Sequence, residues 1–227
     1  MKEVQLPENK VKQYKWFEAF SNPCYALDVT LDTTKLIEFT KKQELSFFIT
    51  FLYIVVKSLN DIDEMRMRYV NGKPIIFDFI SPAYTVMTNA GTFENVRHEF
   101  IEDFKDFYDL AHFHIESAKN QIEIKKEEYN PVDCWDEYYI TCLPWTHFNR
   151  MSHPLPDDKS SLSIPRICWS KYIEENNNFK LTFNITVSHM FVEGYTLAMA
   201  IDKIQKALNN PEVLLTSLEN KQLKKIK

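Results

Sequence analysis

The residues best placed to do chemistry lie near the end of the chain, where a histidine is followed four positions later by a carboxylate. Residues 180–189 alternate apolar and polar side chains, so we expect a strand that ends in His189. Glu193 and Gly194 follow, and we expect Gly194 to permit a tight turn into a helix. A histidine at a strand end can turn one ring nitrogen toward a substrate and act as a general base on a hydroxyl or thiol. Taken alone, such a histidine is more often a hydrogen-bonded core residue.

Other patterns of reactive residues exclude several classes of site. With only 3 glycines, the chain contains no GxGxxG or GxxxxGK[ST] sequence, which excludes Rossmann fingerprints and P-loops. His112 and His114 lie about 200° apart around an expected helix, so they do not share a metal ion easily, and we expect no metal site. His147 and His153 flank a polar loop, and the sequence identifies no partner for either.

The bulk composition is that of a globular protein with a moderately acidic balance. The chain has 227 residues and a formal net charge of −5, so we expect one domain, 1–227 with its core at about 11–210, and no nucleic-acid partner. The 4 cysteines form no CxxC pair and indicate reduced thiols. We find no signal peptide, and the apolar run 47–56 is shorter than the ~20 residues of a membrane span. We therefore expect a cytoplasmic protein with no membrane contact, and we interpret the basic tail 221–227 as a solvated end.

The elements that would position these residues mix helices with strands. Asn71-Gly72 predicts a hairpin between 65–70 and 74–79, because both turn positions need positive φ. The other segments are predicted from their hydrophobic period: helices at 11–20, 34–41, 46–60, 98–111 and beyond Gly194, and strands at 25–31, 84–87, 137–143, 167–173 and 180–189. This order predicts an α/β or α+β layered sheet.

Several segments occur in the order found in one known family. The segment from His189 to Gly194 is similar to an HxxxDG motif, with Glu193 at the acidic position. Four further segments resemble I-S-A-L-P-W, F-D-E-L-R-M, D-P-x-F-T-V…T-F and A-K-Y: Ile140 to Trp145, Ile62 to Arg68, Ser81 to Val86 with Thr92-Phe93, and Ser170 to Tyr172. Together they resemble the chloramphenicol acetyltransferases, within the CoA-dependent acyltransferases, over roughly residues 11–210.

This resemblance implies a two-layer α/β sandwich, with a mixed sheet packed against helices, that forms a homotrimer with active sites between subunits. His189 of one subunit would take the proton of an acceptor hydroxyl, which attacks the thioester of acetyl-CoA. Thr141 stands where the family has a serine that donates to the oxyanion. Acetyl-CoA would be the co-substrate and chloramphenicol, or a similar small alcohol, the acceptor. No bound cofactor or metal is implied.

Further residues match binding positions of the family. Phe20, Tyr25 and Phe93 match aromatic positions that line its acceptor site. Tyr172 matches a tyrosine that contacts CoA, and Lys171 beside it is a candidate phosphate partner.

Some positions depart from the family pattern. The motif aspartate is Glu193, and its arginine partner near the N-terminus aligns with Gln13, so a Glu193–Gln13 hydrogen bond or a Glu193–Lys15 pair would replace the ion pair. A lysine and a tyrosine that help to hold CoA are replaced by Ser46 and Phe48, a threonine is replaced by Cys168, and the first of two adjacent histidines is replaced by Ser188. Two alternatives stay open: an acyltransferase with another acceptor, and a non-catalytic trimeric paralogue.

Overall fold

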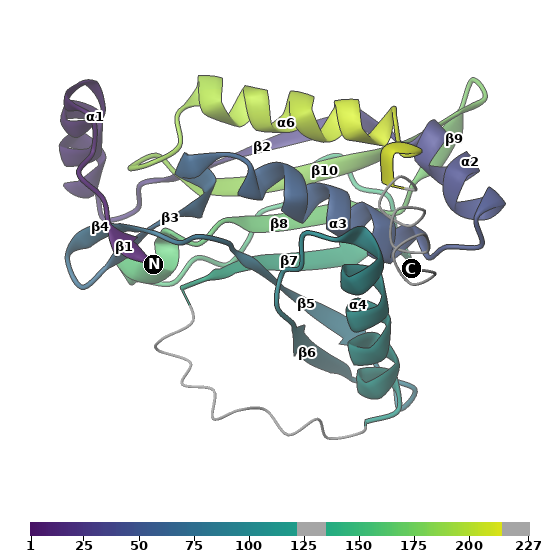
Figure 1. The fold of residues 1–227 in the computed structure, drawn as a ribbon. Helices are drawn as coiled ribbons and strands as arrows, with labels where there is room; N and C mark the ends of the chain where they lie inside the picture. Colours follow the sequence, from purple (N-terminus) through teal and green to yellow (C-terminus); the bar gives the residue numbers. More distant parts are fainter. Residues whose placement is uncertain (122–134, 215–227) are drawn as a thin grey trace, which may run out of the picture.

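The fold is a layer of helices on one face of a mixed β-sheet (Figure 1). The computed structural model describes residues 1–121 and 135–214, so Cys134 and the basic tail lie outside the described residues. In this part of the chain the large sheet has seven strands in the order β2-β10-β8-β7-β5-β6, with β9 paired to β10. Its strands are β2 (Cys24–Asp32), β5 (Ser81–Met87), β6 (Phe93–Arg97), β7 (Glu137–Leu143), β8 (Arg166–Ser170), β9 (Ile173–Glu175) and β10 (Asn178–Ser188). The pairs β5–β7 and β7–β8 are parallel and the others antiparallel, as the expected mixed sheet requires.

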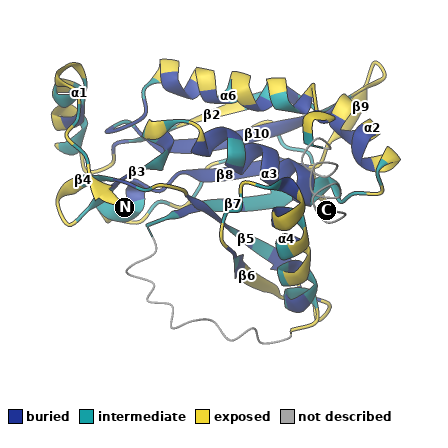
Figure 2. Cartoon of the chain, viewed as in Figure 1, coloured by how far each residue is buried: buried dark blue, intermediate teal, exposed yellow. Residues whose placement is uncertain are grey.

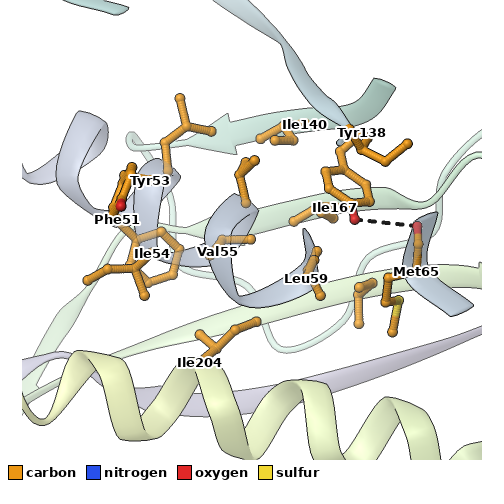
Figure 3. Packing of buried hydrophobic residues seen from close by; sticks show 14 of the residues in the cluster. Phe51, Tyr53, Ile54, Val55, Leu59, Met65, Tyr138, Ile140, Ile167 and Ile204 are labelled. Atoms are coloured by element: carbon orange, nitrogen blue, oxygen red, sulfur yellow. Dashed lines mark hydrogen bonds between the residues drawn. The ribbon is translucent and has the colours of Figure 1, made fainter. Parts of the chain in front are cut away.

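The helical layer is built around one very apolar helix. The helices are α1 (Glu8–Glu18), α2 (Thr34–Lys42), α3 (Phe47–Asn60), α4 (Phe104–Lys119), α5 (Lys159–Leu162) and α6 (Gly194–Leu208). The side chain of Ser46 caps α3 by accepting a hydrogen bond from the Ile49 amide. Residues from Ile49 to Asn60 are buried on nearly all sides of α3, because α6, α4 and the sheet surround it (Figures 2 and 3). Within the described residues, no helix has the length and apolar character that a membrane span requires.

The two faces of the sheet differ in chemistry. Along β10, Phe183 and Ile185 point into the helical core, whereas Asn184 and Thr186 point to the opposite face. This opposite face is also buried, because the segment 149–165 lies across it: Asn184 donates to the Met151 carbonyl at 2.9 Å. We call it the polar face.

A second, smaller sheet contains the predicted hairpin. Its strands, in sheet order, are β1 (Lys2–Glu3), β4 (Lys73–Ile76) and β3 (Met67–Val70). A short 3₁₀ helix, η1 (Asp63–Arg66), directly precedes β3. Asn71 and Gly72 have φ values of 51° and 81°, so both turn residues are left-handed as predicted. The buried Arg68 guanidinium donates to four backbone carbonyls and joins this sheet to the start of β7.

The helix predicted at 98–111 and the strand predicted at 167–173 have different bounds in the structure, and one strand was not predicted. The helix predicted from residue 98 begins at Phe104, because the Asp103 side chain caps it by accepting from the Asp106 amide at 3.1 Å. His98 instead follows β6, a strand that the sequence analysis did not predict. The strand predicted at 167–173 is divided into β8 and β9.

Candidate active site

His189 lies immediately after β10, at the end of the sheet where the chain turns into α6. Its backbone amide donates to the Pro23 carbonyl at 2.8 Å, which ties this turn to the start of β2. Its imidazole stacks on Phe17, with ring centroids 4.0 Å apart and planes 8° apart. The Gln13 amide nitrogen donates to the His189 carbonyl at 3.0 Å and lies 3.5 Å from the ring nitrogen Nδ1. The half-buried ring is therefore fixed by helix α1, which stands at this end of the sheet (Figure 1).

Glu193 forms an ion pair, but with a residue that the sequence analysis did not identify. Its Oε1 lies 2.9 Å from Lys10 Nζ, and the same Nζ lies 2.9 Å from Glu64 Oε1. Burial lowers the pKa of Lys10, but the hydrogen bonds to Glu64 and Glu193 outweigh it and raise the pKa above its ordinary value. The expected Glu193–Gln13 or Glu193–Lys15 contact was wrong, because Lys10 lies one helical turn before Gln13 and supplies the charge.

The backbone conformation at Gly194, the glycine of this turn, does not require a glycine. Gly194 is the first residue of α6, its φ lies outside the left-handed region, and a Cβ added to it would meet no atom within 4 Å. The conformational freedom that we expected Gly194 to supply is not used at this turn, since Gly72 and Gly91 are the glycines with positive φ.

Two of the predicted acceptor residues lie next to His189. The Tyr25 ring centroid is 4.7 Å from that of His189, and its hydroxyl donates to the Val192 carbonyl at 3.3 Å. Burial, and then the charge of Glu193, raise the pKa of Tyr25 to about 12. Phe20 is 42% exposed and packs against Phe17, so it forms the solvent-exposed side of the aromatic rings around His189. We call His189, Glu193, Tyr25 and Phe20 the histidine half-site.

The other predicted residues lie elsewhere on the sheet. Thr141 is in β7 opposite Cys168, and its half-buried side chain is on the polar face. Phe93 is on the edge strand β6, where it pairs with Met87 and is 64% exposed. The strand register places Phe93 on the same face as Thr141, two strands away.

The two predicted CoA-binding residues follow the last residue of β8. Lys171 is exposed, and its amide donates to the Thr146 carbonyl at 2.9 Å. The Tyr172 ring lies edge-on to Phe47 and Phe179, at centroid distances of 5.5 and 5.7 Å. We call Thr141, Phe93, Lys171 and Tyr172 the threonine half-site.

Within one chain the two half-sites do not meet. Thr141 pairs with Cys168, which pairs with Asn184, and His189 lies five residues beyond Asn184 toward the opposite end of β10. The strand rise and the spacing between strands therefore place Thr141 roughly 19 Å from His189. One small acceptor cannot contact both residues of the same chain.

Two residues of α1 that act on the histidine half-site, Lys10 and Phe17, received no role in the sequence analysis, and Gln13 was expected to contact Glu193 rather than His189. Lys10, Gln13 and Phe17 contact Glu193 or His189. Their spacing of three and four residues places them on one helical face, and this period was the signal that could have identified them.

Metal-ligating side chains do not gather at either half-site. Among the described residues, no group of three or more histidine, cysteine or acidic side chains could hold a metal ion. Cys24, Cys142 and Cys168 are free thiols. The chemistry considered below therefore uses the side chains of the two half-sites.

Comparison with known proteins shows the family and the fold of the chain. The family model for chloramphenicol acetyltransferase matches residues 3–205. The chloramphenicol acetyltransferase of Campylobacter coli is 26% identical over 92% of this chain and 100% of its own, and that of Bacillus pumilus is 24% identical over 88% and 91%. A solved chloramphenicol acetyltransferase structure superposes with a TM-score of 0.78 at 20% identity, covering 92% of this chain and all of the other.

The fold is thus that of a two-layer acetyltransferase. The family match over nearly the whole chain identifies it more closely: the chain belongs to the chloramphenicol acetyltransferase family.

Proposed function

We propose that this protein transfers an acetyl group from acetyl-CoA to a hydroxyl of chloramphenicol or a similar small acceptor. The observation that carries the proposal is the position of His189, whose imidazole stacks on Phe17 and whose backbone carbonyl accepts a hydrogen bond from Gln13. The family match supports the same activity, since the relatives from Campylobacter coli and Bacillus pumilus are chloramphenicol acetyltransferases.

The proposed reaction has two steps. The unprotonated ring nitrogen of His189 takes the proton of the acceptor hydroxyl, and the oxygen attacks the thioester carbonyl. The Thr141 hydroxyl donates a hydrogen bond to the resulting oxyanion, a contact that is typically worth about 2.7–4 kcal/mol in the transition state. The carbon–sulfur bond then breaks, and the CoA thiolate takes the proton from His189. Acetyl-CoA is consumed as a co-substrate, and this route uses no metal or bound cofactor.

The separation of the half-sites supports a homotrimer with the reaction between subunits. Because Thr141 lies roughly 19 Å from His189 within one chain, a neighbouring copy must supply one of them. In this arrangement the histidine half-site of one subunit faces the threonine half-site of the next. Phe20, Tyr25 and Phe93 bind the acceptor, while Lys171 and Tyr172 bind CoA.

A thiol-release assay tests the proposal. The full-length protein is mixed with acetyl-CoA and chloramphenicol, and free thiol is followed over time. We expect turnover that falls at least 10³-fold in His189→Ala, since the base is then absent. Release with other alcohols but not with chloramphenicol would indicate a different acceptor. No release with any alcohol would indicate a non-catalytic paralogue, and full activity of His189→Ala would contradict the mechanism.

A further inference from the structure

A second histidine is held in place at the threonine half-site by contacts that the proposed mechanism does not use. His147 lies in the turn after β7, and its Nδ1 is 3.2 Å from both Ser170 Oγ and the Lys171 carbonyl oxygen. Ser170 is only 2% exposed, and its Oγ accepts from the Thr182 amide at 3.0 Å and donates to the Lys171 carbonyl at 2.9 Å. A buried, fully engaged hydroxyl therefore anchors this ring at the end of β8.

These contacts fix which side of the ring is available. The Lys171 carbonyl can only accept, so Nδ1 carries the proton and donates it. The other nitrogen, Nε2, is turned away from β8 and has no hydrogen-bond partner among the residues that the structure describes. With Nδ1 engaged, Nε2 is the ring atom that remains to contact a ligand. The packing of the turn therefore accounts for Nδ1 of His147 but gives no role to Nε2.

The surroundings of His147 favour an anion. Lys171 is exposed and follows the anchoring serine directly, and its backbone is bonded to Thr146 beside His147. Lys41 lies over the Phe179 ring, at 5.5 Å, and Phe179 packs against Tyr172. The nearby carboxylate of Glu175 is already paired with Lys180 at 2.8 Å. Lys171 is thus adjacent in sequence to the serine that anchors His147, and Lys41 is connected to the same segment through the rings of Phe179 and Tyr172. Phosphate groups bind most strongly to such charged donors.

We propose that His147 is a specificity-determining residue that binds a phosphate group of the acyl-CoA co-substrate, beside Lys171 and anchored by Ser170. This inference rests on the proposed function, because acyl-CoA supplies the phosphates. It gives the chain a polar contact on the CoA side of the site, where Ser46 and Phe48 replace polar residues of the family pattern.

A binding titration of the full-length protein with CoA tests this inference without requiring turnover. In His147→Gln we expect the Kd for CoA to rise about 10-fold, because the glutamine side chain lacks the imidazole ring that Ser170 and the Lys171 carbonyl hold in place. Repeating the titration with 3′-dephospho-CoA separates the two phosphate sources. If the 10-fold effect disappears with this ligand, His147 contacts the 3′-phosphate; if it remains, His147 contacts the diphosphate. Equal Kd values for CoA in the wild type and His147→Gln would overturn the inference.

Steady-state kinetics distinguish this role from a structural one. We expect His147→Gln to raise the KM for acetyl-CoA about 10-fold with kcat within twofold of the wild type, and Ser170→Ala to shift KM in the same direction. The matched control is His112→Gln, which makes the same change at an exposed ring that stacks on Tyr108. A loss confined to kcat, or equal effects of both glutamine variants, would contradict the inference. Failure of the wild type to bind CoA would contradict the proposed function as well.

Discussion

At the scale of single residues, the most unusual histidine of this chain is remote from the chemistry. His98 is 3% exposed, and its ring lies 4.9 Å from Phe107, 5.8 Å from Tyr84 and 5.7 Å from His114. Burial lowers its pKa to about 4, although the hydrogen bond to the Glu99 carbonyl opposes the shift. The folded protein therefore holds His98 neutral where the unfolded chain would be protonated.

This burial predicts acid-sensitive stability. Below pH 6.5 the imidazole of residue 98 is protonated in the unfolded chain, but in the folded protein it stays neutral until the pH approaches 4. The free energy of unfolding therefore falls as the pH drops from 6.5 to 4. We expect the loss attributable to His98 to reach about 2 kcal/mol at pH 5. Urea unfolding of the wild type and His98→Phe at pH 7.5 and pH 5 measures this loss. The change in the free energy of unfolding between the two pH values should be smaller in the variant. His112→Phe should keep the wild-type change in stability with pH. A wild-type change in His98→Phe would refute the role of His98 in the acid sensitivity.

A second residue-scale prediction concerns Lys10, the cation that contacts the turn after His189. Lys10 holds Glu193 and Glu64 together, so Lys10→Met leaves two half-buried carboxylates without their cation. We expect a loss of about 1 kcal/mol in the free energy of unfolding and a several-fold fall in kcat, because the turn that carries His189 loosens. Lys12→Met, at an exposed position of the same helix, is the control. If both variants behaved alike in urea and in the thiol assay, the ion pair would have no role in positioning His189.

At the scale of elements, two glycines with different backbone conformations give a matched pair. Gly72 has φ of 81° in the β3–β4 turn, whereas Gly194 has no such requirement and open space around its Cβ position. We expect Gly72→Ala to cost about 1 kcal/mol and Gly194→Ala to be neutral or slightly stabilising at the start of α6. Thermal unfolding of both variants measures this difference. A larger loss in Gly194→Ala would restore the idea that the motif glycine serves the turn.

The elements also show why some predictions from sequence succeeded. β7 occupies Glu137–Leu143 as predicted, since the charge before it and Pro144 after it limit the strand. α3 was predicted because its run of residues is apolar on nearly all sides, as in a buried helix, and the structure adds a serine cap at Ser46. By contrast, Phe100 continues the helical spacing of α4 toward the N-terminus, and only the Asp103 cap reveals the true start. The edge strand β6 has exposed residues from Phe93 to Asn95, so no apolar alternation marks it.

The candidate site was predictable to different degrees. His189, Glu193 and Tyr25 come together as neighbours of one turn, which the order of motifs along the chain indicated. The contact between Lys10 and Glu193 joins residues far apart in sequence, and it depends on how α1 is rotated against the turn. The anchoring of His147 by Ser170 likewise depends on the path of the chain after β7, which hydrophobic period does not determine.

At the scale of the whole molecule, the proposed function together with the distance between the half-sites predicts that activity depends on assembly of the subunits. Each site of the proposed trimer takes His189 from one subunit and Thr141 from a neighbour. His189→Ala and Thr141→Ala trimers should both have strongly reduced activity, since each lacks one half of every site. Size-exclusion chromatography with light scattering should give three chain masses for each variant, which separates loss of chemistry from loss of assembly.

Mixing the two variants then tests the shared site directly. If they are unfolded together at equal concentration and refolded, random assembly gives both intact residues to about one quarter of the sites. We therefore expect recovery of up to about 25% of wild-type turnover, because a threonine variant supplies His189 and a histidine variant supplies Thr141. Each variant refolded alone should recover nothing and serves as the control. If the mixture is a trimer but no more active than the sum of its parts, His189 and Thr141 do not act on one substrate across the interface.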